Sequence, residues 1–191
     1  MRILSGKYKG RVIKMPPGVR PTQDKVRKSF FDILKDCIEG VKFLDLFAGS
    51  GVMGIEALSR GASFCVFVEA AGQQSKTLRE NLDLLGIRDA LVLAQDAQRA
   101  IENLHKQKKF FDIVFLDPPY YQDMAKKTLQ SLSDCDILTP KALVVVQHFK
   151  RDQLPEAIGK LVLWRISKYG DTRLSFYQRG APGRQSATLP D

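Results

Sequence analysis

The segment LDLFAGSGVMGIEAL, residues 44–58, determines the fold that we expect for this chain. Its apolar start predicts a buried strand, and its second half predicts a helix. The turn between them has three glycines in the pattern G-x-G-x-x-G, namely Gly49, Gly51 and Gly54, and Glu69 follows Gly49 by 20 residues. In α/β sheets such glycines allow a tight turn and a close approach of the backbone to a ligand, while the later acid binds ribose hydroxyls. We therefore expect a Rossmann-like sheet that binds a ribose-containing ligand at the carboxyl ends of its strands.

Strands and helices alternate from the start of this segment to about residue 147. Five short apolar runs predict strands, at 43–46, 64–69, 90–94, 111–116 and 142–147, and helical patterns separate them. Runs that are apolar throughout are typical of parallel strands covered by helices on both faces. Residues 162–167 and 174–177 have little sequence between them and predict an antiparallel pair. The sequence thus predicts an α/β fold with a seven-stranded sheet, six strands parallel and one antiparallel, flanked by helices.

The two ends of the chain differ from this pattern. Residues 2–4 and 11–14 predict a short β-hairpin, which prolines separate from a helix that begins near Asp24. Residues 180–191 show no periodicity, and we expect a flexible tail there. We therefore divide the chain into an N-terminal arm (1–22), one α/β domain (23–179) and a tail (180–191).

Positive charge is concentrated near the N-terminus. The chain has a net charge of +9, and residues 1–28 hold nine lysines and arginines against one acid, Asp24. A charge confined to one segment favours a polyanion such as nucleic acid, although a solvated arm without a partner would look the same.

The composition also narrows the setting. No apolar run reaches the roughly 18 residues that span a bilayer, and the N-terminus lacks the apolar core of a signal peptide. Three separated cysteines and two distant histidines form no metal-binding pattern. We expect a cytoplasmic protein that binds neither a metal nor a membrane.

Two cofactors fit the glycine turn, because NAD and S-adenosylmethionine (SAM) both carry adenosine. Asp45 lies four residues before Gly49, where a carboxylate can hold the ammonium group that SAM has and NAD lacks. Asp96 follows the third predicted strand and is placed for the adenine amino group. Phe47 either packs beside the ligand or fills the core. The predicted SAM site consists of Asp45, Phe47, Ala48, Gly49, Ser50, Gly51, Glu69, Asp96 and Asp117.

The motif Asp117-Pro118-Pro119-Tyr120 ends the fourth predicted strand, because proline has no N–H to continue a ladder. The amine of a nucleobase is a poor nucleophile, since its lone pair is delocalised into the ring. Two acceptors on its N–H groups, the Asp117 carboxylate and the Pro118 carbonyl, would turn that lone pair toward a methyl donor. Tyr120 would stack on the base, which must first flip out of its helix. We predict methyl transfer from SAM to an exocyclic amine, with S-adenosyl-L-homocysteine as the product; a helix-capping Asp117 is the structural alternative.

The combined motifs resemble those of class I SAM-dependent methyltransferases that act on amino groups. More narrowly, they are similar to the RsmD-type bacterial family that methylates N2 of guanine in 16S ribosomal RNA. The matching stretches are a basic R-I-x-x-G-x-x-x-G-R start, R-P-T at 20–22, V-R at 26–27, D-x-F-A-G-S-G at 45–51, D-P-P-Y at 117–120 and YGDTRLSFYQR at 169–179. Two departures are EAAG after the second strand, where a further polar residue is usual, and Gln147, where an acid often ends the fifth strand.

The resemblance implies that the partner is ribosomal RNA, within the 30S subunit or an assembly intermediate, and we expect the protein to be a monomer. Candidate RNA contacts are Arg11, Arg20, Thr22 and Arg27, although Thr22 and Asp24 could instead cap the following helix.

Two other functions remain open. An adenine-N6 methyltransferase on DNA or RNA would share the chemistry, but would be expected to need a larger target-recognition region. An NAD-binding oxidoreductase or regulator would explain the glycines, but neither D-P-P-Y nor the basic arm.

Overall fold

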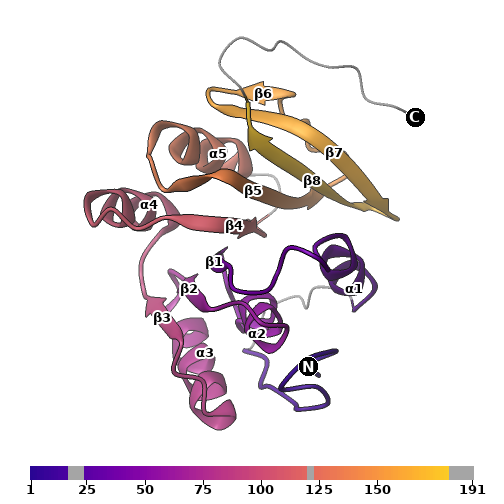
Figure 1. Ribbon diagram of the computed structural model, residues 1–191, viewed down its shortest axis with the longest axis vertical. Coiled ribbons are helices and arrows are strands. Elements are labelled where there is room, and N and C mark those ends of the chain that lie inside the picture. The colour runs from indigo at the N-terminus through magenta and orange to yellow at the C-terminus, as the bar shows by residue number, and fades with distance from the viewer. Residues whose placement is uncertain (17–23, 120–122, 181–191) are drawn as a thin grey trace. The chain divides into compact units, whose positions relative to one another are not determined.

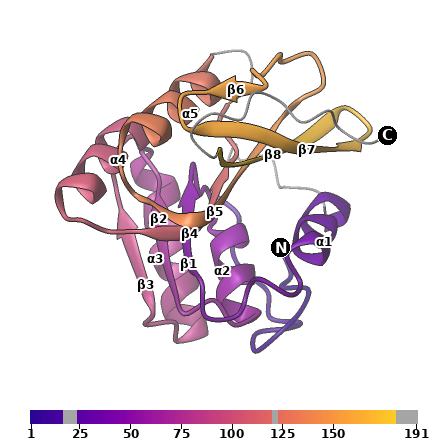
Figure 2. The same ribbon diagram turned by 45° about the horizontal axis from the view of Figure 1, so that its top comes forward.

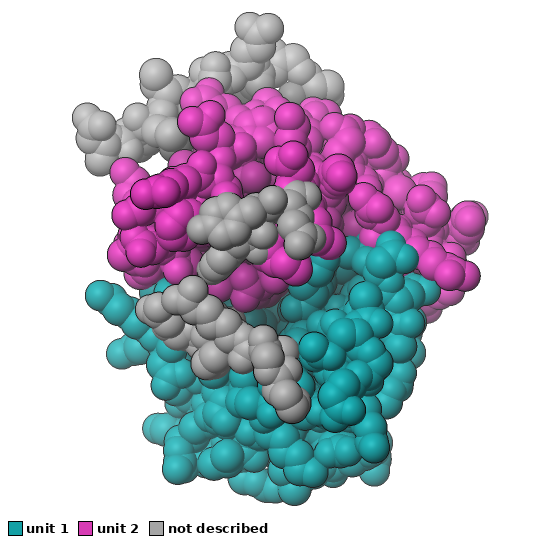
Figure 3. Space-filling view, turned by 180° about the vertical axis from the view of Figure 1, so that it is seen from behind, with its two compact units in different colours: residues 1–97 teal, residues 98–191 magenta. Residues whose placement is uncertain are grey.

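The computed structural model describes residues 1–16, 24–119 and 123–180 (Figure 1). The chain divides into two compact units, residues 1–97 and 98–191, which Figure 3 shows in two colours. The described residues form five helices and eight strands. No helix among these described residues is long and apolar enough to cross a membrane.

The first unit is built on three parallel strands in the order β3-β2-β1 (Figures 1 and 2). Its elements are α1 (Asp24–Ile33), β1 (Lys42–Leu46), α2 (Val52–Ser59), β2 (Phe64–Val68), α3 (Gly72–Leu85) and β3 (Ala90–Leu93). α2 packs on β1 and β2, and α3 packs on β3. Every residue of α2 is buried. Gly54 permits this close packing, because a Cβ there would lie 2.5 Å from Cys65 Sγ.

The second unit contains a strand order of β4-β5-β8-β7-β6. Its elements are α4 (Ala97–Lys106, whose first residue ends the first unit), β4 (Phe111–Leu116), α5 (Met124–Asp134), β5 (Leu138–Phe149), β6 (Ala157–Ile158), β7 (Leu161–Tyr169) and β8 (Thr172–Arg179). β4 and β5 are parallel, and the remaining pairings are antiparallel. The predicted antiparallel pair is confirmed as β7 and β8. The strand that the sequence did not predict is β6, which has two residues.

The described part of the N-terminal arm, residues 1–16, folds back on itself. Ile3 N donates to Arg11 O and Gly10 N donates to Ile3 O, both at 2.9 Å, and Arg2 and Val12 form an antiparallel bridge. These bonds make the hairpin that the sequence predicted. Ile3 and Ile13 are buried, so the hairpin has an apolar side that belongs to the core of the first unit.

The arm is held to α2 by a buried carboxylate. Glu56 is fully buried, and its oxygens accept hydrogen bonds from Leu4 N at 2.8 Å and Ser5 N at 3.0 Å. Arg60 Nε, one turn later on α2, pairs with the same carboxylate at 2.9 Å. Ser59 adds a second attachment, because its carbonyl accepts from Lys7 N at 2.7 Å and its hydroxyl accepts from Tyr8 N at 2.9 Å. The arm is therefore an integral part of the first unit.

Candidate active site

Asp45 lies at the end of β1 and is nearly inaccessible, with 2% of its surface exposed. Its Oδ2 accepts a hydrogen bond from Gly54 N at 3.0 Å. Gly54 is the third residue of α2, and the first amides of a helix have no partner within the helix. Gly51, at the N-cap, makes no side-chain capping bond, so the carboxylate of β1 supplies it. Asp45 thus fixes the start of α2 relative to the strand.

The loop from Phe47 to Gly51 has an unusual backbone. Phe47, Gly49 and Gly51 have φ values of 66°, 55° and 80°, in the left-handed region that favours glycine. At Gly51, a Cβ would lie 2.1 Å from Leu78 Cδ1, so a side chain there would require the buried Leu78 to move as well as an unfavourable backbone conformation. Phe47 adopts a left-handed conformation without being a glycine, and residues held in this way cluster at binding sites.

Glu69 follows β2 and holds this loop. Its Oε2 accepts from Gly49 N at 2.8 Å, and its Oε1 accepts from Ala71 N at 2.9 Å. The side chain is half-buried. Because each carboxylate oxygen has two lone pairs, these bonds leave capacity for the ribose hydroxyls that we predict as ligands. Asp96 lies exposed after β3. The structure thus brings Asp45, Glu69 and Asp96 to the carboxyl ends of three neighbouring parallel strands.

Asn81 on α3 is a site residue that the sequence analysis did not identify. Its side chain is fully buried, with Oδ1 accepting from Lys14 N at 2.8 Å. Its Nδ2 donates to Lys14 O and to Ser50 O, both at 3.0 Å. One amide therefore binds both the arm and the glycine loop. The available signal was a polar residue beside Leu78 and Leu82 on the face of α3 that packs inward.

The second group of predicted residues lies at the end of β4. Asp117 is half-buried, Pro118 is buried and Pro119 is exposed, while Tyr120 lies outside the described residues. β4 and β5 are parallel with Leu116 opposite Val146, which places Asp117 beside Gln147. Gln147 Nε2 donates to Asp117 Oδ2 at 3.1 Å. The Asp117 carboxylate is therefore oriented by a neutral donor from the adjacent strand.

A cavity of about 380 Å³ adjoins this motif. It is lined by Pro118 and Pro119, by residues 123–126 at the start of α5, by Gln147 and His148 at the end of β5, and by residues 151–154. Cavities of this size hold small organic ligands, so the volume is sufficient for a nucleobase. Its lining carries charges of both signs, from Lys126 and Arg151 and from Asp123 and Asp152.

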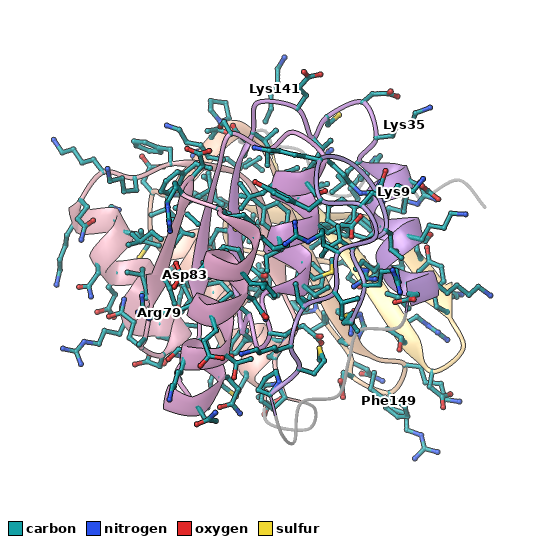
Figure 4. The ribbon with its side chains drawn as sticks, turned by 90° about the horizontal axis from the view of Figure 1, so that it is seen from below. Lys9, Lys35, Arg79, Asp83, Lys141 and Phe149 are labelled. Atoms are coloured by element: carbon teal, nitrogen blue, oxygen red, sulfur yellow. The ribbon has the colours of Figure 1, made fainter. Side chains whose placement is uncertain are left out.

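His148, which also lines this cavity, has both ring nitrogens in contact with other protein groups. Its Nε2 lies 2.8 Å from Ser175 Oγ and its Nδ1 lies 3.0 Å from Phe149 O, at the end of β5, where Figure 4 labels Phe149. Burial lowers the pKa of His148 below the ordinary value of histidine. The imidazole is therefore held neutral near pH 7, with both nitrogens engaged.

The predicted RNA contacts are placed differently from one another. Arg11 is exposed, and its Nη2 donates to Leu84 O at 3.0 Å. Arg20 and Thr22 lie outside the described residues. Arg27 is fully buried: its Nη2 donates to Arg2 O at 2.7 Å and to Asp24 Oδ1 at 3.0 Å, and burial lowers its pKa. A guanidinium in this position supports the arm and does not present its charge to RNA, which does not fit the prediction for Arg27.

The described ranges contain no group of three or more His, Cys, Asp or Glu side chains arranged to hold a metal ion. Asp45, Glu69 and Asp117 instead bind backbone amides or a side-chain amide.

Comparison with known proteins places the chain in a family. Residues 1–178 match the family model described as Conserved hypothetical protein 95. The chain belongs to this family. It is 39% identical over 182 residues to the Bacillus subtilis protein named "Putative rRNA methyltransferase YlbH", covering 94% of this chain and 99% of that protein. It is 34% identical over 189 residues to "Ribosomal RNA small subunit methyltransferase D" of Escherichia coli, covering 98% of this chain and 94% of that protein.

A solved structure that is similar to this chain has the same fold. The "Putative methyltransferase yhhF" from Escherichia coli matches with a TM-score of 0.82 at 34% identity, over 95% of this chain and 98% of that one. The family resemblance and the Rossmann-like methyltransferase fold that the sequence predicted are both confirmed.

Proposed function

We propose that this protein transfers a methyl group from SAM to the exocyclic N2 amine of a guanine in small-subunit ribosomal RNA. The observation that carries the proposal is Asp117, oriented at the end of β4 beside a cavity that fits a nucleobase. Relatives that match nearly the whole chain are named as ribosomal RNA methyltransferases, which supports the RNA class. We also propose that the protein acts as a cytoplasmic monomer, on the 30S subunit or an assembly intermediate.

The residues of the first unit fit SAM by their chemistry. Three carboxylates end successive parallel strands, and SAM presents three groups that carboxylates bind: an ammonium, a ribose diol and an adenine amine. In the proposal Asp45 binds the ammonium, Glu69 binds the ribose, and Asp96 lies near the adenine. The glycine loop supplies backbone close to the ligand. When bound, SAM supplies an activated methyl group on a positively charged sulfur.

The residues of the second unit act on the amine. The Asp117 carboxylate accepts one N–H of the guanine amine, and the Pro118 carbonyl, held by the fixed φ of proline, accepts the other. These bonds draw the nitrogen toward tetrahedral geometry, so that its lone pair can form the new N–C bond as the bond between the methyl carbon and sulfur breaks and S-adenosyl-L-homocysteine leaves. Both acceptors also stabilise the positive charge that develops on nitrogen, until the nitrogen gives up one proton through the Asp117 carboxylate to water. Tyr120 is proposed to stack on the flipped base.

The arm is proposed to bind the RNA backbone. Lys7, Lys9 and Arg11 are exposed, and Lys9 is labelled in Figure 4. Because the arm is bonded to α2 through its main chain, these cations project from a fixed support. Exposed lysines and arginines attract phosphates without reading the sequence, so the arm would contribute affinity and the cavity would contribute specificity.

Mass spectrometry of nucleosides tests the proposal. The protein is incubated with SAM and either naked ribosomal RNA or 30S particles from cells that lack the enzyme, and the RNA is then digested. We expect N2-methylguanosine, while N6-methyladenosine would support the adenine alternative. Calorimetry with SAM and NAD separates the cofactors, and tighter binding of NAD would contradict the proposal.

A further inference from the structure

The two ends of the Gln147 amide have different environments. Its nitrogen donates to Asp117 Oδ2, as described above. Its oxygen, Oε1, is shielded from solvent and has no hydrogen-bond partner among the described residues. The residue as a whole is 6% exposed. Buried polar atoms are nearly always hydrogen-bonded in folded proteins, so an orphaned acceptor next to a reactive carboxylate calls for an explanation.

The orientation of this amide is fixed by its neighbour. An ionised carboxylate can only accept hydrogen bonds, so the nitrogen must face Asp117 and the oxygen must face away. The bond lengths of an amide, about 1.3 Å and 1.2 Å, then place Oε1 less than about 6 Å from Asp117 Oδ2. Gln147 also lines the cavity beside Pro118. The unpaired oxygen is therefore close to the Asp117 carboxylate, one of the two acceptors that we assign to the amine.

The other polar groups of this wall do not pair with Oε1. His148, the next residue, has both ring nitrogens engaged with Ser175 and Phe149. Asp152 accepts from Phe149 N at 3.0 Å. A donor for Oε1 therefore has to come from outside the described contacts, and a bound base is one source.

Nucleobases with an amine differ in the group beside it. Guanine has a donor, N1–H, next to its N2 amine, and the two present three N–H bonds in a row. Adenine and cytosine have an unprotonated ring nitrogen next to their amine, which is an acceptor. A third acceptor beside Asp117 and Pro118 therefore complements guanine, whereas it would oppose a lone pair of adenine or cytosine.

We propose that Gln147 is a specificity-determining residue: its Oε1 accepts the N1–H of the guanine whose N2 amine is held by Asp117 and Pro118. This inference rests on the proposed function and extends it from the amine to the choice of base. Gln147 makes both contacts with one side chain, since its other end orients Asp117.

A change in the base tests this assignment. The guanosine that the wild-type protein methylates is first located by mass spectrometry, and the RNA is then made with either guanosine or 2-aminopurine riboside at that position. 2-Aminopurine keeps the N2 amine but has an acceptor at N1, and it lacks O6. We expect wild-type protein to prefer guanosine in kcat/KM by about 10- to 100-fold, the usual effect of one unsatisfied buried hydrogen bond.

Gln147→Leu isolates the contribution of this residue. Leucine has a similar volume and no polar atoms, so the preference for guanosine over 2-aminopurine should fall by about tenfold or more. The missing O6 of 2-aminopurine affects wild type and Gln147→Leu alike, so it cancels when the two preferences are compared. Gln130→Leu is the matched control: Gln130 also donates to an aspartate, Asp134 Oδ1 at 2.8 Å, but lies exposed on α5. Gln130→Leu should show the same preference for guanosine over 2-aminopurine as wild type. Thermal unfolding of each variant checks that it is folded.

Three outcomes are distinguishable. If Gln147→Leu slows both RNAs equally and the preference is unchanged, Gln147 only positions Asp117 and the assignment is wrong. If wild-type protein methylates no guanosine, the proposed function fails first. Gln147→Glu gives an independent check, because it keeps an acceptor toward the base but places a second carboxylate against Asp117. This variant should keep the preference for guanosine. The acid limb of its pH–rate profile should move to higher pH, since like charges raise carboxyl pKa values. Loss of the preference in this variant would also overturn the assignment.

Discussion

Glu56 is the residue whose replacement tests how the arm is attached. Its buried carboxylate accepts from Leu4 N, Ser5 N and Arg60 Nε. Glutamine keeps the size of the side chain but has one acceptor oxygen in place of two, and it carries no charge. One hydrogen bond to a charged group contributes about 1.5–3 kcal/mol, so we expect Glu56→Gln to lower the free energy of unfolding by that amount.

Glu56→Ala should have a larger effect. It removes all three contacts and leaves Arg60, whose side chain is 17% exposed, without its partner. Breaking a buried ion pair in this way costs about 3–5 kcal/mol. In a protein of this size each kcal/mol lowers Tm by about 2–4 °C, so Glu56→Gln should lower Tm by roughly 3–12 °C and Glu56→Ala by more.

Two measurements check these values. Thermal unfolding followed by circular dichroism gives the global effect. Trypsin cleavage gives the local effect, because the arm contains Lys7, Lys9 and Arg11 and must open before it can be cut. Cleavage within the arm should be about tenfold faster or more in Glu56→Gln, if opening limits the population that is cut.

Glu80→Gln is the control, because Glu80 also contacts the arm. It pairs with Lys14 at 2.8 Å, but both side chains are exposed, at 41% and 62%. Exposed ion pairs contribute little, so its Tm should stay within about 2 °C of wild type. The reasoning would be refuted if Glu56→Gln matched this control in both Tm and cleavage rate.

Three further predictions concern catalysis, RNA binding and pH. Asp117→Ala should keep SAM affinity within severalfold in calorimetry but lose about 100-fold or more in turnover. Asp83→Ala, at an exposed position on α3 (Figure 4), should leave both SAM affinity and turnover unchanged. Unchanged turnover in Asp117→Ala would remove Asp117 from the mechanism. Reversing the charges of Arg11 and Arg20 should weaken RNA binding and reduce the slope of log K against log salt by about 0.7 per lost phosphate contact, as filter binding at several salt concentrations would show. Burial lowers the pKa of His148 in the folded protein. On acidification the histidine therefore takes up a proton in the unfolded chain before it does so in the folded protein. The stability that neutral His148 contributes is present above about pH 6.5 and is lost as the pH falls below that value. Urea unfolding between pH 7 and pH 5 should therefore show a steeper loss of stability for wild type than for His148→Gln, and equal slopes would contradict this account.

The fold could be predicted from the sequence because its main signals are local. Apolar runs marked the strands, and the glycine turn marked the strand-to-helix connection, where Gly49 and Gly51 need positive φ. β6 (Ala157–Ile158) was not predicted because two residues are too short to show a period. Its pairing with β7 depends on tertiary structure.

The site was harder to predict where its contacts are distant in sequence. Asn81 and Lys14 are separated by 67 residues, and Glu56 and Leu4 by 52. Contacts between residues so far apart in the sequence produce no local pattern from which they could be predicted. Arg27 shows the same limit: a cation in a basic segment suggests exposure, but in the folded chain Arg27 is fully buried and donates to Arg2 O, 25 residues away. The pairing of Gln147 with Asp117 required the register of β4 against β5.

The way in which the arm is held has a consequence for how its sequence can change. Its attachments to α2 and α3 run mostly through main-chain atoms, those of Leu4, Ser5, Lys7, Tyr8 and Lys14. Side-chain identity is restricted mainly at Ile3 and Ile13, which are buried, and at Gly6, where a Cβ would lie 1.6 Å from Ser59 O. Mutations at the exposed arm positions can therefore accumulate without loss of docking. In the proposed function, such changes would alter the strength with which the arm attracts RNA phosphates, while its main-chain attachments to α2 and α3 stay the same.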